Sequence, residues 1–309
     1  MQLGQTNRTK RILLRRLKES WQWWLLLLPA FVYVCIFAYG PMYGLQIAFR
    51  NYRPRQGITG SAWVGLEHFI RFFNYPNFWK MLRNTLTITL YSLATFPCAI
   101  LFALMLNEVY QVKLKKSMQM ITYAPHFMSE VVVCSLVWMM LDRANGPINN
   151  LIAALGGERI AFMTDPASFP SIYVWSGVWQ NLGWDSILYI SALASISPEI
   201  VEAAKIDGAN RLQIIRHVNI PGILPTIAIT FIMRTGGLLS VGHTKIFLLQ
   251  NDLNLDASQV ISTYVYNIGL VDGQYSYSTA IGLFNNLANI LVLLLANKIV
   301  KKATDTGLF

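Results

Sequence analysis

Long apolar stretches separated by short polar segments dominate the pattern of this chain. Six stretches approach the roughly 20 residues that a helix needs to cross the hydrocarbon core of a bilayer. They lie near residues 22–43, 84–106, 120–141, 170–192, 222–243 and 278–298. The fourth is the least continuous, because Gln180, Asn181 and Asp185 interrupt it. The pattern predicts an all-α membrane protein with six transmembrane helices, whose transmembrane domain covers residues 21–309.

The composition supports this class. Of the 309 residues, 54% are hydrophobic and 13% are charged, whereas soluble domains carry about 25% charged residues. The net charge of +10 does not indicate nucleic-acid binding, because the basic residues gather at the ends of apolar stretches, as membrane orientation requires. Cys35, Cys98 and Cys134 lie in apolar stretches without metal-like spacing. We expect them to be small core residues rather than metal ligands.

Residues 1–20 form a basic segment before the first apolar stretch. The apolar stretch is much longer than the roughly 7–15 residues of a secretory signal core, so we expect it to be retained as the first span. The basic segment is then cytoplasmic, either as an amphipathic helix on anionic membrane lipid or as a tail that only fixes topology. With six spans, both termini and the polar segment between the fourth and fifth spans face the cytoplasm.

That polar segment, residues 198–221, carries strong helix signals. Ser197 is expected to cap the first turn by accepting a hydrogen bond from a backbone N–H group. Pro198 suits the first helical position, and Glu199 and Glu202 suit the positive amino end of a helix.

The second half of the segment predicts a turn followed by another short helix. Gly208 permits a sharp turn. Leu212, Ile215 and Val218 recur at three-residue spacing, which predicts an apolar stripe that packs beneath the spans. Pro221 is expected to close the unit.

The spacing of this segment resembles a known signature. Glu202, Ala203 and Ala204 are followed after three residues by Gly208, and after nine more by Val218, Asn219, Ile220 and Pro221. This order resembles the E-A-A, three residues, G, nine residues, I-x-L-P signature of binding-protein-dependent ABC importer permeases. Two positions depart from it, since Val218 replaces the first Ile and Ile220 replaces the Leu.

Further motifs resemble the oligosaccharide and polysaccharide branch of these permeases, which includes alginate and aldouronate transport permeases. These motifs are Pro41–Gly44, Ile47–Phe49, Trp63–Phe69, Asn84–Thr85, Ala124–Phe127, Ile261–Tyr266, Phe284–Asn286 and Ala296–Lys298.

The resemblance implies a type I ABC importer permease fold with a cytoplasmic coupling helix, in a bacterial cell (inner) membrane. It also implies four kinds of partner: a second homologous permease, two ATPase subunits, an extracytoplasmic solute-binding protein and an oligosaccharide or polysaccharide substrate. The positions that match the coupling signature, or lie inside it, are Glu202, Ala203, Ala204, Asp207, Gly208, Ala209 and Pro221.

The chain carries no sign of its own nucleotide chemistry. It has no Gly-x-x-x-x-Gly-Lys-Ser/Thr phosphate loop, and its four histidines are scattered. We therefore expect a transport subunit rather than an enzyme, with no catalytic residue, metal or cofactor in this chain. ATP and magnesium are expected in the partner ATPase subunits.

Polar side chains at membrane depth mark the candidate substrate pathway, because they are costly unless they face protein or a wet cavity. Glu130, Gln180 and Lys245 are further polar groups, and Gly236 with Gly237 could let the fifth span bend. Each polar group could instead join helices, for example as an ion pair between Arg234 and Asp185 or Glu130. The candidate pathway residues are Asn181, Trp184, Asp185, Arg234, His243, Asn285, Asn286 and Asn289.

Two other functions remain open from the residues alone. The first is an ABC permease for a solute other than a sugar, because the coupling signature does not name the cargo. The second is an ATP-independent carrier or a membrane enzyme. Carriers often contain internal repeats, and this sequence shows none.

Overall fold

The computed structural model describes residues 20–308. The basic segment expected at residues 1–20 therefore lies outside the described residues except for Ser20. The chain divides into two compact units, the first ending at Glu67 and the second beginning at His68. The boundary falls at the first residue of α4, so this helix is described with the second unit. Among the described residues the structure is helical, with two isolated β-bridges, Arg50 to Trp63 and Arg53 to Gly57.

The first unit is one long apolar helical stretch and a short loop. The stretch runs from Trp21 to Phe49 and has no buried residue in its first part, so its apolar side chains are free to meet lipid or another subunit. In the loop, Trp63 stacks on Phe49 at 5.6 Å between ring centroids, and the Arg50 guanidinium lies 5.5 Å from the Trp63 ring. The elements are α2 (Trp21–Val34), the π-helical η1 (Cys35–Tyr39), the 3-10 helical η2 (Gly40–Phe49) and α3 (Gly57–Gly60).

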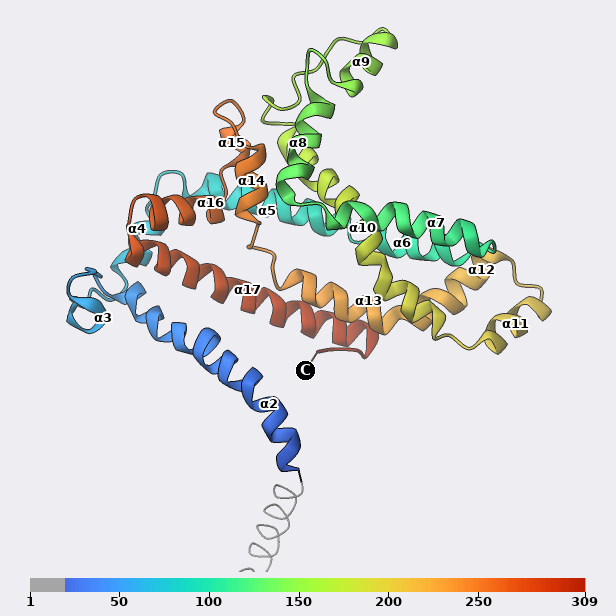
Figure 1. Cartoon of the computed structure of the whole chain (residues 1–309), viewed down its shortest axis with the longest axis horizontal. Helices are drawn as coiled ribbons and strands as arrows, with labels where there is room; N and C mark the ends of the chain where they lie inside the picture. Colours follow the sequence, from blue (N-terminus) through green and yellow to red (C-terminus); the bar gives the residue numbers. More distant parts are fainter. Residues whose placement is uncertain (1–19, 309) are drawn as a thin grey trace, which may run out of the picture. The chain divides into compact units, whose positions relative to one another are not determined.

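The second unit holds the remaining helices (Figure 1). Its first half contains α4 (Glu67–Phe73), α5 (Phe78–Ala94), α6 (Pro97–Asn107), α7 (Val112–Tyr123), η3 (Ala124–Phe127), α8 (Glu130–Leu141), α9 (Pro147–Ala154) and α10 (Phe169–Ala194). Its second half contains α11 (Pro198–Ile206), α12 (Arg211–Ile214), η4 (Ile215–Asn219), α13 (Ile220–Thr235), α14 (His243–Leu249), α15 (Leu255–Ser258), α16 (Ile261–Tyr266), η5 (Asn267–Val271) and α17 (Tyr275–Thr304).

Three apolar clusters hold this unit together. One joins α4, α5, α16 and α17 around Phe72, Met81 and Ile281. A second joins α5, α8, α10 and α14, and includes Ile246 and Leu249. The third joins α6, α10 and α13, and includes Phe96, Tyr189 and Ile223. Helix α10 contacts both α6 and α13, so it is the central helix of the unit.

Close backbone packing occurs where α10 crosses α7. A Cβ atom at Gly183 would lie 2.4 Å from the backbone oxygen of Thr122. Real Cβ atoms do not approach an oxygen so closely, so this crossing requires glycine.

The helices differ in continuity from the six expected spans. Among residues 20–308, four helices are long and apolar enough to cross a membrane, and six are reached if each of two bent pairs counts as one span. The stretch expected at 120–141 forms α7 and α8, which meet at 103° around η3, and α10 meets α11 at 72°. The first bend falls at Met128 and Ser129, whose backbone is extended, and the Ser129 hydroxyl caps the start of α8 by accepting from Val132 N at 3.3 Å.

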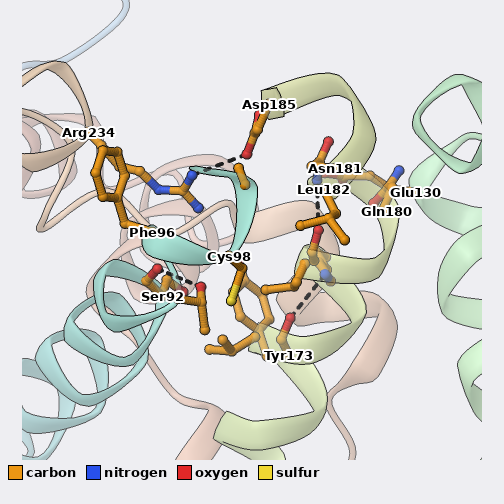
Figure 2. A pocket seen from close by; sticks show the side chains of 16 residues that line it. Ser92, Phe96, Cys98, Glu130, Tyr173, Gln180, Asn181, Leu182, Asp185 and Arg234 are labelled. Carbon is orange, nitrogen blue, oxygen red and sulfur yellow. Dashed lines mark hydrogen bonds and ion pairs between the residues drawn. The ribbon is translucent and has the colours of Figure 1, made fainter. Parts of the chain in front are cut away.

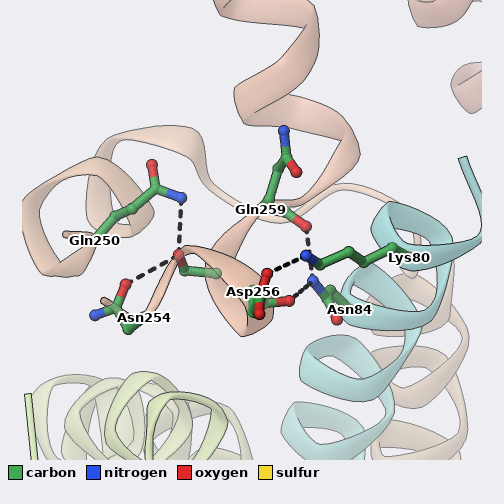
Figure 3. A network of polar contacts seen from close by, with 7 residues as sticks. Lys80, Asn84, Gln250, Asn254, Asp256 and Gln259 are labelled. Carbon is green, nitrogen blue, oxygen red and sulfur yellow. Dashed lines mark hydrogen bonds and ion pairs between the residues drawn. The ribbon is translucent and has the colours of Figure 1, made fainter. Parts of the chain in front are cut away.

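A polar network fastens the loop around α15 to α5 (Figure 3). The Lys80 ammonium forms an ion pair with Asp256, and the Asn84 amide donates to the backbone oxygens of Asp256 and Gln259 at 2.8 and 3.0 Å. The buried Asn254 amide donates to the oxygen of Met163 at 3.0 Å.

Candidate functional site

The 198–221 segment forms two short helices joined by a tight turn. Gly208 has a φ of +80°, in the left-handed region, and no atom lies within 4 Å of the position its Cβ would take. Glycine is therefore favoured at position 208 by the backbone conformation of the turn, and not because a larger side chain would clash there. After it, Asn210 and Gln213 form a capping box, in which Asn210 Oδ1 accepts from Gln213 N at 2.9 Å and Gln213 Oε1 accepts from Asn210 N at 2.7 Å.

Three sequence expectations for this segment were wrong in detail. Ser197 makes no side-chain cap hydrogen bond, although Pro198 does open α11. Leu212 is 76% exposed, so it does not join a packed stripe; Ile214 is the buried residue of α12. Pro221 does not end a helix, because the helical stretch runs on from Arg211 to Thr235. Pro221 stands in the first turn of α13, after the π-helical η4 (Ile215–Asn219), at a position where a missing N–H group is tolerated.

The outer surface of the segment is open. Glu202, Ala203, Asp207 and Gly208 are exposed, and so is Pro221. Ala204 and Ala209 are half-buried, and α11 contains no buried residue.

Large apolar side chains are also exposed there. Ile206 is 86% exposed, and Ile200 is exposed as well as Leu212. The Arg211 guanidinium lies 5.3 Å from the ring of Tyr110, and this contact links the segment to the loop between α6 and α7.

A second feature is a polar cavity of about 370 Å³ within the second unit (Figure 2). That volume is within the range of small-molecule sites, about 300–1,000 Å³. Helix α10 supplies half of the lining residues, and α5, α6, α8, α13, α14 and the link between α5 and α6 supply the rest. The polar and charged lining residues are Ser92, Thr95, Glu130, Tyr173, Gln180, Asn181, Asp185, Arg234 and Lys245.

Three of the candidate pathway residues meet at this cavity. Arg234, in the last turn of α13, donates to Asp185 at 3.1 Å, and both side chains are about 40% exposed (41% and 36%). Figure 2 shows this pair on one side of the cavity and Asn181 on another. Of the two partners considered for Arg234, Asp185 is the one that the structure places there.

Trp184 borders a neighbouring hollow of about 420 Å³, which Asp185 and Arg234 also line. Its ring stacks on His126 at 4.3 Å and 5° between planes, and His126 Nδ1 lies 2.9 Å from Asn181 Oδ1. His126 therefore joins the α7–α8 bend to α10.

The other four candidates lie elsewhere. Asn289 Oδ1 accepts from Leu239 N at 2.8 Å and its Nδ2 donates to Ser240 Oγ at 2.8 Å. Asn285 Nδ2 donates to Leu239 O at 3.1 Å. Both amides from α17 thus bind residues 236–242, the break between α13 and α14. Asn286 and His243 do not line the polar cavity either, and the His243 ring stacks on Tyr266 at 5.3 Å.

The structure adds lining residues that the candidate set omits. Lys245 and Glu130 supply charge, and Gln180 donates to the oxygen of Met128 at 3.3 Å. Their polarity inside an apolar stretch was the available signal, but only the fold brings α8, α10 and α14 to one cavity. Across residues 20–308, no group of three or more His, Cys, Asp or Glu side chains could hold a metal ion.

Comparison with known proteins gives consistent matches. Residues 57–305 match the family described as binding-protein-dependent transport system inner membrane component. The polygalacturonan/rhamnogalacturonan transport system permease protein YteP of Bacillus subtilis (strain 168) is 41% identical over 304 residues, covering 98% of this chain and 94% of that protein. Protein LplB of the same organism is 40% identical over 293 residues, covering 94% of this chain and 92% of LplB.

A solved structure resembles the whole fold. It is a crystal structure of a bacterial alginate ABC transporter in complex with an alginate pentasaccharide-bound periplasmic protein. One of its chains superposes with a TM-score of 0.87 at 39% identity, covering 95% of this chain and 99% of that chain.

Proposed function

The chain belongs to the family of binding-protein-dependent transport system inner membrane components, and on that premise we propose that it is the permease subunit of an ATP-driven oligosaccharide or polysaccharide importer. It is a transport subunit rather than an enzyme. The cargo class follows the relatives, one named for polygalacturonan/rhamnogalacturonan transport and another solved as an alginate transporter.

The exposed apolar surface of the 198–221 segment carries the coupling proposal. Ile206 ends α11 and Leu212 lies in the first turn of the Arg211–Thr235 helix, and no part of the described chain covers either side chain. Exposed apolar side chains on such a segment are typical of a helix that docks in a groove of another protein. Glu202 and Asp207 add charge beside them, while Ala203 and Ala204 let a partner approach the backbone.

Four partners and one orientation complete the proposal. The chain pairs with a second homologous permease, and two ATPase subunits bind the 198–221 segments and hydrolyse ATP with magnesium. An extracytoplasmic binding protein delivers the substrate. Both termini lie in the cytoplasm. The substrate pathway runs past Asn181, Trp184, Asp185 and Arg234. We keep the other four candidate residues in the proposed pathway, as residues that support the α13–α14 break and its surroundings. They are His243, Asn285, Asn286 and Asn289.

The coupling proposal is tested at Ile206. Replacing Ile206 with Asp puts a charge into the apolar contact, and we expect recovery of the ATPase subunit with the affinity-tagged permease to fall at least about tenfold, as for loss of a central interface residue. Ile206→Met is the matched control, because it keeps an apolar side chain of similar size, and it should retain the ATPase.

Both variants should reach the membrane at the wild-type level, since residue 206 supports no packing of its own chain. Full ATPase recovery with Ile206→Asp would contradict the proposal.

A further inference from the structure

Lys245 is the most deeply buried charged side chain that lines the polar cavity, with 6% of its surface exposed. The chain is held in place both after and before Lys245. The neighbouring Ile246 and Leu249 are fully buried in the cluster that joins α5, α8, α10 and α14. The break before α14 is held in turn by Asn285 and Asn289 of α17.

The amino group of Lys245 has few partners in this position. It donates to the oxygen of Tyr173 at 3.0 Å and lies 4.9 Å from the Tyr173 ring. Gly177 leaves the space beside it open, since a methyl group there would lie 3.2 Å from Nζ. An ammonium has three N–H donors, so two remain after the bond to Tyr173.

The two cationic side chains that line the cavity, Arg234 and Lys245, differ in whether a carboxylate contacts them. Arg234 already pairs with Asp185 at 3.1 Å. Within residues 20–308, no carboxylate lies within 4 Å of the Lys245 amino group, although Glu130 lines the same cavity. A buried ammonium without a counter-ion is costly, and a carboxylate that binds it gains a charge-assisted hydrogen bond.

We propose that Lys245 is a specificity-determining residue that binds the carboxylate of a uronic-acid sugar as the oligosaccharide passes through the cavity. The inference rests on the proposed function and narrows its cargo to acidic glycans. Gln180 lines the same cavity, and its Nε2 donates to the oxygen of Met128 while its Oε1 accepts no hydrogen bond within residues 20–308. That oxygen can accept from a sugar hydroxyl, so one cavity offers both kinds of contact that a uronate needs.

The test uses the assembled transporter in lipid nanodiscs without its binding protein, so that only the permeases select the ligand. The probes are trigalacturonate and its fully methyl-esterified form, which differ in charge and not in sugar. Binding is measured by equilibrium dialysis for the wild type, Lys245→Gln, Lys245→Arg and Lys113→Gln. Lys113 is an exposed lysine of α7 and serves as the control.

We expect the wild type to bind the acid about tenfold or more tightly than the ester, the size of effect that a charged hydrogen bond gives. Lys245→Gln can still donate to Tyr173 but carries no charge, and it should lose this preference. Lys245→Arg and Lys113→Gln should keep it. Equal binding of acid and ester by the wild type, or an unchanged preference in Lys245→Gln, would overturn the inference.

Failure of the proposed function and failure of the role of Lys245 give different results. If the wild-type complex with its binding protein imports no oligosaccharide, acidic or neutral, the proposed function fails and the inference with it. If the wild type imports trigalacturonate and Lys245→Gln imports it with the same KM, only the role of Lys245 is refuted. Should Lys245→Gln fail to assemble, the wild-type comparison of acid with ester still decides.

Discussion

Single residues in this chain are constrained for different physical reasons, and only some of these reasons are readable from the sequence. Gly208 was predicted as a turn residue, and its φ of +80° agrees with that. Gly183 gave no such signal, because its need arises from Thr122, a residue on another helix. Lys245 was noted as a polar group at membrane depth, but its burial against Tyr173 of α10 depends on a distant helix and could not be read from the sequence.

The packing at Gly183 gives a prediction at this scale. Gly183→Ala places a methyl group against the Thr122 oxygen, so we expect a loss of about 1–3 kcal/mol, as for other overpacked sites. Gly282→Ala in α17 is the control, because nothing lies within 4 Å of its Cβ position. A thermal-unfolding midpoint that falls for Gly183→Ala and does not fall for Gly282→Ala supports the packing argument. Equal midpoints would refute it.

Whole elements were predicted well where periodicity and end signals agree, and less well where a helix is interrupted. The stretch at 222–243 was expected to be one span, but the helix ends at Thr235 and restarts at His243. Gly236 and Gly237, which lie directly after Thr235, were the signal in the sequence for this interruption. The partners that hold it, Asn285 and Asn289, lie 46 to 50 residues further along the chain and carry no local signal.

The tether between α5 and the α15 loop predicts a pH dependence. The hydrogen bond from Lys80, with its positive charge, holds the pKa of Asp256 below its usual value. A carboxyl group with a lowered folded-state pKa stabilises the fold above its unfolded pKa of about 3.9, and this contribution is lost as the pH falls through the folded value.

Asp256→Asn should therefore lower the unfolding midpoint at pH 7 but match the wild type in the acid range below the folded pKa. Scans of both proteins from pH 7 downwards check this. A constant difference between them at every pH would contradict it.

At the scale of the molecule, apolar content and the polar 198–221 segment were enough to predict a helical membrane protein of this family. The part of the chain that the structure describes has four continuous helices that could span a membrane, and six when the two bent pairs are included. Hydropathy counts apolar residues and does not register a bend, so the 103° angle between α7 and α8 could not be read from the sequence.

The six-span orientation predicts opposite sides for two exposed loops. In a variant with Cys35, Cys98 and Cys134 replaced by Ala, Glu202→Cys should react with a membrane-impermeant maleimide only after the membrane is opened. Glu158→Cys, in the loop between α9 and α10, should react in intact cells. Labelling of residue 202 from outside would reverse the orientation and remove the coupling proposal.

The two asparagines of α17 have a mechanical consequence. Their side chains form hydrogen bonds with the N–H and the C=O of Leu239 and with the Ser240 hydroxyl. A shift of the segment between α13 and α14 relative to α17 would therefore break three hydrogen bonds at once. We expect the final helix and the lysine-bearing helix to travel as one rigid piece. Under the coupling mechanism that we propose, a movement of the ATPase subunit at the start of the 211–235 helix would therefore change the contacts between α13 and α10 beside the cavity.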